Sequence, residues 1–371
     1  MMEKTLPEVC IIQYGFPFDS SKFCSAEGVP LVRIRDVVRG YSETYTTEIA
    51  GENYIVNDGD LLIGMDGEFN IAYWKGGRAY LNQRVCRLIP REDVDRDYIF
   101  YYMPQALKAI EDATPFVTVK HLSAKQLSKI LIPLPDMSEQ QRISAVLRSV
   151  DRVIAMRKKE LDELTNLVKS RFIELFGNYD LTHPQESWAP IKEVGTVVGG
   201  ATPKTDHDEY WGGSYRWITP AELDADSGYI YDSVRKLTKA GVESCSLQEM
   251  PVGTVILSSR APIGKVAIAG NTFYCNQGFK NIICKEGITP RYLYTVLLLN
   301  VEYLNSLGRG ATFKEISKGI VESIRIPVPS MELQEQFAAF VEQTDKSKLA
   351  VQKGLQELEI LKKSLMQQYF G

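Results

Sequence analysis

The feature that most constrains the fold of this chain is an internal repeat with a long period. The segment Ile132–Met137, which reads IPLPDM, returns as Ile326–Met331, which reads IPVPSM, 194 positions later. Further pairs at this offset, reached without a gap, are Gly59/Gly253, Asn82/Asn276, Gln83/Gln277, Tyr98/Tyr292, Gln140/Gln334 and Asp151/Asp345. Solenoid repeats have periods of only about 20 to 50 residues. The chain is therefore a duplicated domain in which each copy carries an appendage.

Length and composition limit the class of protein. A chain of 371 residues favours two or three domains, and no apolar run approaches the roughly 20 residues that span a bilayer. The N-terminal segment has no apolar signal-peptide core, so we expect a cytoplasmic protein without membrane contact. The 6 cysteines form no Cys-x-x-Cys pair and the 3 histidines are scattered, which predicts reduced thiols and no metal site.

Each copy is predicted to have a β-rich front and a helical tail. The boundaries are 1–135 for the first front, 136–177 for its tail, 178–329 for the second front and 330–371 for the second tail. Short apolar runs bounded by Gly, Asn and Asp predict strands at 31–34, 61–63, 85–89, 217–218, 255–257, 266–268 and 281–283. Helices are expected at 97–110 and 292–304, and a hairpin turn at 75–78.

The tails carry heptad patterns typical of paired helices. Each tail is about 39 residues long, or roughly 58 Å at 1.5 Å per residue. Ser138 followed by Gln141 is a capping-box pattern at the first helix start. The predicted coiled-coil seam residues are Ile143, Leu147, Val150, Ile154, Leu161 and Leu164 in the first tail, and Val341, Val351, Leu355 and Leu358 in the second.

The direction of pairing follows from chain connectivity. The first helix leads into the second front, and that front leads into the second helix. If the two ends of a front lie close together, as domain termini often do, the second helix starts where the first one stops. We therefore expect an α+β fold with two similar globular domains, separated by two long helices that pair as an antiparallel coiled coil with a pseudo-twofold axis.

Motifs for catalysis are missing. There is no Pro-Pro for the Asp/Asn-Pro-Pro-aromatic loop of amino-methyltransferases, and Pro135-Asp136 has no acidic-x-Lys sequence downstream to form a nuclease centre. Gly264-Lys265 lacks the other residues of a phosphate-binding loop. We expect no catalytic activity from this chain.

Polar and basic side chains on turns form the candidate binding surface. The net charge of −4 does not favour nucleic acid, so a DNA-binding face requires local clustering of Lys and Arg. Such side chains bind phosphates and base edges, although any one of them is more often a solvated turn residue, and Asn82-Gln83 and Asn276-Gln277 can equally be structural strand starts. The candidate DNA-binding residues are Arg33, Arg35, Lys75, Arg78, Gln83, Arg84 and Lys120 in the first front, and Thr202, Lys204, Ser259, Arg260, Lys265, Gln277, Lys280 and Lys314 in the second.

With its Ile-Pro-x-Pro-x-Met elements and long helices, the chain resembles the specificity subunit of type I DNA restriction–modification systems. The segments 200–203, 210–213, 253–260, 263–267 and 276–279 resemble that family's target recognition domain. The first front departs from this pattern, because Asp66 stands at the position of Arg260 and Gly15-Phe16-Pro17-Phe18 replaces Gly200-Ala201-Thr202-Pro203. Arg260 and Lys265 thus have no basic counterpart at the same offset in the first copy.

The resemblance implies a role in DNA recognition. In that family two target recognition domains each read one half of a bipartite, gapped site in double-stranded DNA, and the long helices set the gap. Two methyltransferase subunits dock on the helices and use S-adenosylmethionine, restriction subunits can join them, and the specificity subunit itself has no cofactor. Two alternatives remain at this point: a recognition subunit for a fused restriction–methylation enzyme, and a coiled-coil adaptor without a DNA role.

Overall fold

The computed structural model describes residues 2–114, 120–223, 228–260, 262–310 and 314–371. Contacts divide the chain into two compact units, of which unit 1 comprises residues 1–159 and 352–371 and unit 2 comprises residues 160–351. Each unit contains one β-rich front together with part of both long helices. Ala261 lies outside the described residues, as do Thr118 and Thr312, a further pair at the offset of 194.

The front of unit 1 consists of short strands and helices, and its last element before the long helix is a strand. Its strands are β1 (Met2–Thr5), β2 (Cys10–Tyr14), β3 (Phe23–Cys24), β4 (Val29–Val32), β5 (Tyr45–Thr46), β6 (Ile55–Val56), β7 (Leu61–Gly64), β8 (Asn70–Tyr73), β9 (Ala79–Leu81), β10 (Val85–Pro90) and β11 (Leu131–Leu134). Its front helices are α1 (Leu6–Val9), α2 (Ile34–Arg39), α3 (Arg96–Ala113) and α4 (Ala124–Leu127).

Unit 2 repeats this plan. Its strands are β12 (Ala189–Pro190), β13 (Gly195–Val198), β14 (Trp211–Ile218), β15 (Tyr229–Ile230), β16 (Arg235–Leu237), β17 (Val255–Leu257), β18 (Val266–Ala269), β19 (Tyr274–Cys275), β20 (Asn281–Cys284) and β21 (Arg325–Ile326). Its front helices are α6 (Ile191–Val194), α7 (Lys239–Ser244), α8 (Pro290–Leu299), α9 (Val301–Ser306) and α10 (Lys318–Ser323).

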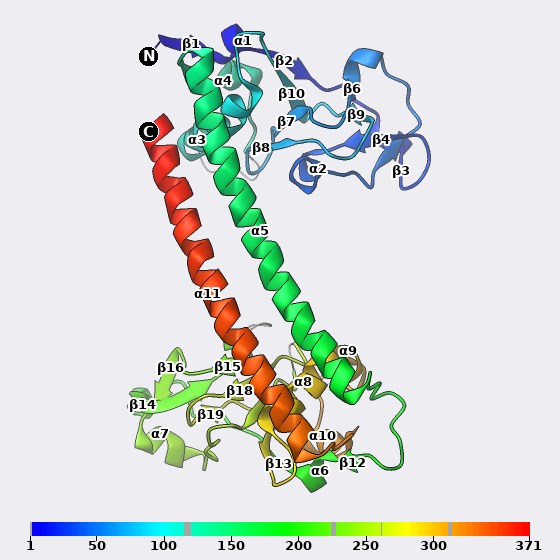
Figure 1. Ribbon diagram of the computed structural model, residues 1–371, viewed down its shortest axis with the longest axis vertical. Coiled ribbons are helices and arrows are strands. Elements are labelled where there is room, and N and C mark those ends of the chain that lie inside the picture. The colour runs from blue at the N-terminus through cyan, green and yellow to red at the C-terminus, as the bar shows by residue number, and fades with distance from the viewer. Residues whose placement is uncertain (1, 115–119, 224–227, 261, 311–313) are drawn as a thin grey trace. The chain divides into compact units, whose positions relative to one another are not determined.

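The two fronts share one sheet order. In unit 1 the strands β2, β10, β7 and β8 lie side by side in that order, and in unit 2 β13, β20, β17 and β18 do the same, with β15 added at the edge (Figure 1). A second sheet in each unit contains one parallel pair, β4 with β9 and β14 with β19. The duplicated sequence therefore folds into a duplicated topology.

The two long helices are α5 (Met137–Phe176) and α11 (Met331–Phe370), each of 40 residues. Within unit 1 their segments run antiparallel, because Asp151 forms an ion pair of 2.6 Å with Lys362 and the guanidinium of Arg142 lies 5.5 Å from the Tyr369 ring. Within unit 2 the segments are also antiparallel, because the Arg171 guanidinium lies 5.7 Å from the Phe340 ring while the Phe176 ring lies 5.6 Å from that of Phe337.

The heptad seam is visible in the burial of the two helices. The seam residues Ile143, Leu147, Val341 and Val351 are buried, and Val150, Ile154, Leu161, Leu164, Leu355 and Leu358 are half-buried. Among the helices in the described ranges, none is long and apolar enough to cross a membrane.

The Ile-Pro-x-Pro elements connect each front to its long helix. The hydroxyl of Tyr98 on α3 donates to the carbonyl of Pro133 at 2.5 Å, and the hydroxyl of Tyr292 on α8 donates to the carbonyl of Pro327 at 3.0 Å. Both tyrosines are fully buried. The repeated prolines mark the point where a front helix, a short strand and the start of a long helix meet.

Several local predictions are wrong. Residues 75–78 form no hairpin, because β8 before them pairs with β7 while β9 after them pairs with β4 and β6 in another sheet. The expected helix at 292–304 is two helices, interrupted at Asn300. The first long helix is capped by Asp136, whose carboxylate accepts from the Glu139 N–H at 2.9 Å, and not by the box that begins at Ser138.

Candidate nucleic-acid interface

The end of the parallel strand pair positions one group of polar side chains in unit 2. Asn276 follows β19 and its N–H donates to the carbonyl of Ile218, the last residue of β14, at 3.2 Å. Because the carboxyl ends of parallel strands meet at one edge of a sheet, the residues that follow both strands gather there. Thr202 reaches this edge from the loop after β13, and its hydroxyl donates to Oε1 of Gln277 at 2.6 Å. Both side chains are exposed.

Unit 1 builds the same edge with different side chains. Asn82 follows β9 and its N–H donates to the carbonyl of Val32, the last residue of β4, at 3.3 Å. Arg33 and Gln83 therefore leave the ends of neighbouring parallel strands, and both are exposed. The Phe16 N–H donates to the Leu81 carbonyl at 2.8 Å.

The matching bond in unit 2 runs from the Ala201 N–H to the Cys275 carbonyl, at 3.0 Å. This equivalence confirms the predicted replacement of 200–203 by 15–18. A Cβ on Gly15 would lie 2.1 Å from the Asn82 carbonyl oxygen, and one on Gly200 would lie 2.0 Å from that of Cys275. Both positions therefore require glycine, because any side chain would clash with backbone.

A second group in unit 2 surrounds the loop after β17. Ser259 donates its N–H to the Gly278 carbonyl at 2.8 Å and accepts at its own carbonyl from the Ile316 N–H at 3.0 Å. Arg260, the next residue, forms a β-bridge with Glu315. The ammonium of Lys280 lies 3.1 Å from the carboxylate of Glu315.

The equivalent loop in unit 1 has the same main-chain pattern. Met65 donates its N–H to the Arg84 carbonyl at 3.0 Å, and the Leu122 N–H donates to the Met65 carbonyl at 2.7 Å. Asp66 forms a β-bridge with His121, and their side chains lie 2.5 Å apart. Arg84 places its Nε 3.5 Å from the same Asp66 carboxylate.

Lys265 and Lys314 border the groups in unit 2. The Lys265 ammonium donates to the carbonyl of Pro220 at 3.1 Å, which connects the loop after β17 with the turn after β14. Lys314 is exposed, and its Cβ would lie 3.1 Å from a Cβ on Gly308. Lys204 is exposed on the loop of Thr202, where its carbonyl accepts from the Trp211 indole at 3.2 Å.

The remaining candidates of unit 1 are more dispersed. Arg35 lies on α2, and its guanidinium donates to the Thr44 hydroxyl at 3.1 Å. Lys75 is exposed beside Gly40, which follows the last residue of α2. Arg78 forms an exposed ion pair of 3.0 Å with Glu52. Lys120 donates from its ammonium to the Glu111 carbonyl at 2.6 Å. These four residues form no single cluster with Arg84.

Two candidates are better explained as structural. Ser259 is fully buried, and its hydroxyl accepts a hydrogen bond of 3.3 Å from the Lys280 ammonium. The Lys280 side chain is only 14% exposed and is neutralised by Glu315. Because base or phosphate contact requires an accessible side chain, we remove both residues from the candidate interface.

The sequence reasoning missed the acidic members of the site. These members are Asp66, Glu315 and Glu222. Asp66 contacts Arg84 and Glu315 contacts Lys280. Glu222 accepts from the Thr219 N–H at 2.9 Å just after β14. The 194-residue offset relates Asp66 to Arg260 and His121 to Glu315. A comparison of charged residues at equivalent positions of the two copies would have found Asp66 and Glu315.

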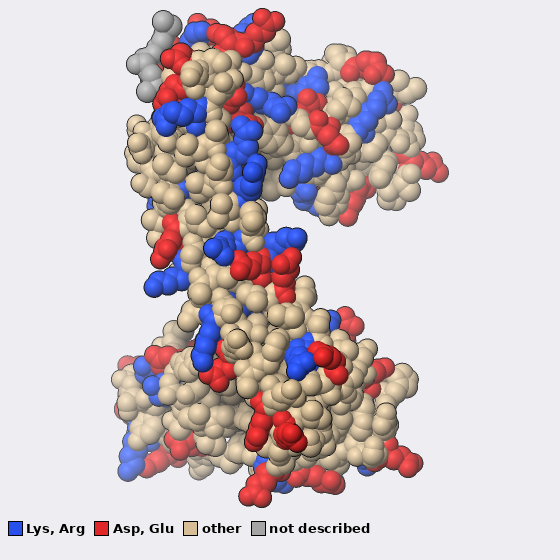
Figure 2. Space-filling view, viewed as in Figure 1, with Lys and Arg blue, Asp and Glu red and all other residues tan. Residues whose placement is uncertain are grey.

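The visible surface has a mixed charge pattern. On the face shown in Figure 2, Lys and Arg side chains are interspersed with Asp and Glu in each unit. No group of three or more His, Cys, Asp or Glu side chains within the described ranges is arranged to hold a metal ion.

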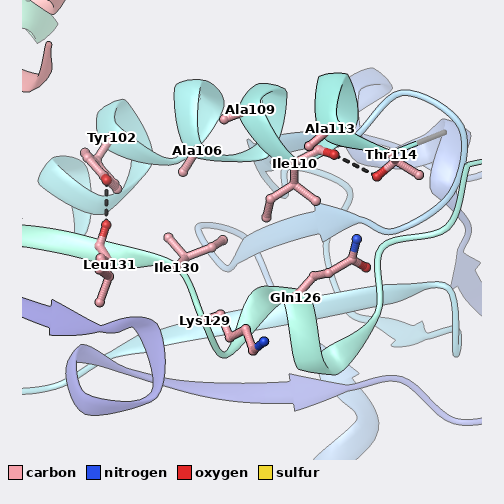
Figure 3. A pocket seen from close by; sticks show the side chains of 10 residues that line it. All are labelled: Tyr102, Ala106, Ala109, Ile110, Ala113, Thr114, Gln126, Lys129, Ile130 and Leu131. Atoms are coloured by element: carbon pink, nitrogen blue, oxygen red, sulfur yellow. Dashed lines mark hydrogen bonds between the residues drawn. The ribbon is translucent and has the colours of Figure 1, made fainter.

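A pocket of about 480 Å³ in unit 1 lies apart from these groups. Figure 3 shows it between α3, which contributes Ala106 and Ile110, and the segment that carries Gln126 and Ile130. The Tyr102 hydroxyl donates across one end to the Leu131 carbonyl at 2.5 Å. None of the candidate DNA-binding residues lines this pocket.

Comparison with known proteins identifies relatives for the whole chain. The family model described as type I restriction modification DNA specificity domain matches residues 1–166 and again 186–360. The MjaIX specificity subunit of Methanocaldococcus jannaschii is 42% identical over 185 residues, which cover 48% of this chain and 43% of that protein. The EcoBI specificity subunit of Escherichia coli is 40% identical over 167 residues, covering 44% of this chain and 35% of that protein.

These two matches therefore span less than half the length of the relatives concerned. A longer match is the putative MjaX specificity subunit of Methanocaldococcus jannaschii, 25% identical over 375 residues, covering 91% of this chain and 85% of that protein.

Two solved structures share the fold. The S subunit of a type I restriction–modification system from M. genitalium superposes with a TM-score of 0.59 at 13% identity, covering 98% of this chain and 94% of the other. A chain from a structure of a type I restriction–modification system, described for its complex assembly and conformational transition, has a TM-score of 0.61 at 18% identity, covering 100% of this chain and 97% of the other. The family model matches the greater part of both copies, and this chain belongs to the type I restriction modification DNA specificity family.

Proposed function

We propose that this chain is the non-catalytic subunit that gives a type I restriction–modification complex its DNA sequence specificity. Each front reads one half of a bipartite, gapped site in double-stranded DNA. The candidate contacts are those left exposed or half-buried at the two loop groups of each unit: Arg33, Gln83 and Arg84 in unit 1, and Thr202, Lys204, Arg260, Lys265, Gln277 and Lys314 in unit 2. Arg35, Lys75, Arg78 and Lys120 supply further phosphate contacts.

The observation that carries this proposal is that the two units share main-chain hydrogen bonds but differ in the side chains beside them. The main-chain bonds from Asn82 to Val32 and from Asn276 to Ile218 are equivalent, yet the side chains at this edge differ. Arg33 is exposed, whereas its counterpart Thr219 is half-buried and donates to Glu222. The exposed Thr202 stands in unit 2 where unit 1 has Pro17. Side chains of both kinds hydrogen-bond base edges and phosphates. Two copies of one frame with different exposed side chains are what two unlike half-sites require.

The partners follow from the family. Two methyltransferase subunits dock on the long helices and supply S-adenosylmethionine, so this chain itself needs no cofactor. Restriction subunits can join the complex, which acts in the cytoplasm. The exposed apolar side chains Met156, Leu349 and Ile360 on α5 and α11 support protein contacts there, since they are 62%, 68% and 69% exposed.

The test is co-expression of the chain with its methyltransferase subunits. The purified complex is incubated with a random duplex library, bound DNA is sequenced, and methylated adenines are mapped in the host genome. Two fixed half-sites at a constant gap are expected in both measurements. A complex that assembles yet binds all sequences equally would overturn the proposal.

A further inference from the structure

The loop after β7 in unit 1 and the loop after β17 in unit 2 have equivalent main-chain frames, described above, but they exchange charge. Three positions are paired by the frame: Asp66 with Arg260, Arg84 with Gly278, and His121 with Glu315. At the first position an acid is replaced by an arginine. At the second an arginine is replaced by a residue without a side chain.

The exchange leaves a guanidinium in the same place. In unit 1 Arg84 extends toward position 66, and its Nε lies 3.5 Å from the Asp66 carboxylate. In unit 2 Arg260 extends toward position 278, and its Nε lies 3.5 Å from the point where a Cβ on Gly278 would stand. A side chain at 278 would compete for this space. In each unit one arginine therefore lies between the two paired positions. It comes from position 84 in unit 1 and from position 260 in unit 2.

The surroundings of Arg84 favour a base contact over a phosphate contact. Its side chain is 48% exposed, whereas that of Asp66 is 18% exposed, so the carboxylate lies behind the guanidinium and orients it. Arg84 Nη1 also lies 3.2 Å from His121 Nδ1, so two neighbours hold the guanidinium. The paired carboxylate offsets the positive charge that attracts phosphate, while the half of the side chain that solvent reaches can still donate to a base. Guanidinium groups in a fixed orientation recognise the O6 and N7 acceptors of guanine in the major groove.

We propose that Arg84 and Arg260 are equivalent specificity-determining residues, each reading one guanine in the half-site of its own unit. This inference rests on the proposed DNA-reading function and adds to it the identity of one reading group in each unit. It also replaces the expectation that Arg260 has no basic counterpart in the first copy. The counterpart is Arg84, which an alignment by offset places opposite Gly278.

The experiment uses the full chain in complex with its methyltransferase subunits and a random duplex library. The variants are Arg84→Ala, Arg260→Ala and the exchange variant Asp66→Arg/Arg84→Gly/His121→Glu, which gives unit 1 the residues of unit 2. Arg91→Ala and Lys285→Ala are matched controls, since these two residues are equivalent by the offset and follow the far ends of β10 and β20.

Arg84→Ala is expected to lose the preference for one guanine by about tenfold or more in one half-site, and Arg260→Ala to do the same in the other half-site. The exchange variant is expected to keep the guanine that Arg84→Ala loses, and both controls to bind like the unmodified complex. Unaltered preferences at the other positions of the same half-site show that the substituted unit is folded.

Uniform weakening of all sequences by the two alanine variants would make them phosphate contacts and overturn the inference. Loss of the guanine in the exchange variant, with the other positions of that half-site still recognised, would overturn the equivalence. If the exchange variant does not fold, the two alanine variants decide, and unchanged preferences in both would refute the proposal. In each of these cases the unmodified complex still selects a bipartite site, whereas failure of the proposed function removes that selection itself.

Discussion

The side-chain amide of Gln334 donates a hydrogen bond of 2.9 Å to the main-chain carbonyl of Pro329. The same nitrogen donates to the Gly287 carbonyl at 3.0 Å, and Oε1 accepts from the Thr289 N–H at 2.8 Å. The glutamine is fully buried. It therefore joins the start of α11 to the turn before α8 by satisfying three main-chain groups at once. In unit 1 Gln140 forms the equivalent bonds.

Replacing Gln334 with leucine, which is similar in size, should lower the free energy of unfolding by about 3 kcal/mol. The reason is that three buried main-chain groups lose their partners, and each unsatisfied group costs about 1–3 kcal/mol. Urea denaturation measures the effect. Gln343→Leu is the control, because Gln343 is exposed on the same helix. Equal midpoints for the two variants would contradict this account of the buried amide.

The ion pair between Asp151 and Lys362 should stabilise the helix pairing in unit 1 by about 1 kcal/mol. Both side chains are about one-third exposed, and Asp151 also accepts from the Tyr101 hydroxyl at 3.0 Å, so screening by solvent is incomplete. A double-mutant cycle with Asp151→Ala and Lys362→Ala isolates the coupling energy. The pair Lys346 and Glu342, exposed on one face of α11, serves as reference and should couple less. A coupling energy near zero between Asp151 and Lys362 would show that this ion pair does not stabilise the helix pairing.

Removing one heptad from each long helix should shorten the gap between half-sites. Residues 154–160 and 352–358 are the matched deletion, because the contacts of Asp151 with Lys362 and of Lys158 with Glu359 set the antiparallel register. Each helix shortens by about 10 Å, or about three base pairs. Sequencing of bound or methylated DNA should show unchanged half-sites with a smaller gap. An unchanged gap would rule out the helices as the spacing element.

The buried thiols should make stability fall at alkaline pH. Burial raises the pKa of Cys86 and Cys275 to about 12, whereas an unfolded thiol titrates near 8.5. Their contribution is complete below the unfolded pKa and is lost as pH rises through the window up to about 12. At pH 9.5 each thiol should cost about 1.4 kcal/mol relative to neutral pH. The double variant Cys86→Ala/Cys275→Ala should therefore show a smaller fall in urea midpoint between pH 8 and 9.5, whereas Cys245→Ala, at a half-buried position, should not.

The sequence predicted what depends on periodic burial. The seam residues of each long helix are separated by steps of three or four or by sums of such steps, and a helix buries one stripe whatever its partners, so their burial follows from spacing. Strands such as 61–63 and 255–257 were found because their apolar runs are continuous and bounded by turn residues. In these cases local sequence and tertiary packing favour the same structure.

Other features depend on contacts that no local pattern records. Residues 75–78 look like a hairpin turn, yet β8 pairs with β7 while β9 pairs with β4 and β6 in another sheet. The pairing of Arg84 with the position of Arg260 was hidden for a similar reason. An alignment by offset compares residues at equivalent backbone positions. It cannot show that a long side chain from one position reaches the space beside another position.

The bonds from Asn82 to Val32 and from Asn276 to Ile218 have a consequence for how such a protein changes over time. Both bonds join main-chain atoms, so their formation does not depend on which side chains follow them. Under the proposed function, substitutions at the next positions alter the bases that are recognised at little cost to folding. Under that function, a lineage that gains a new half-site in this way would change the sites that are methylated and the sites that are cut in one step.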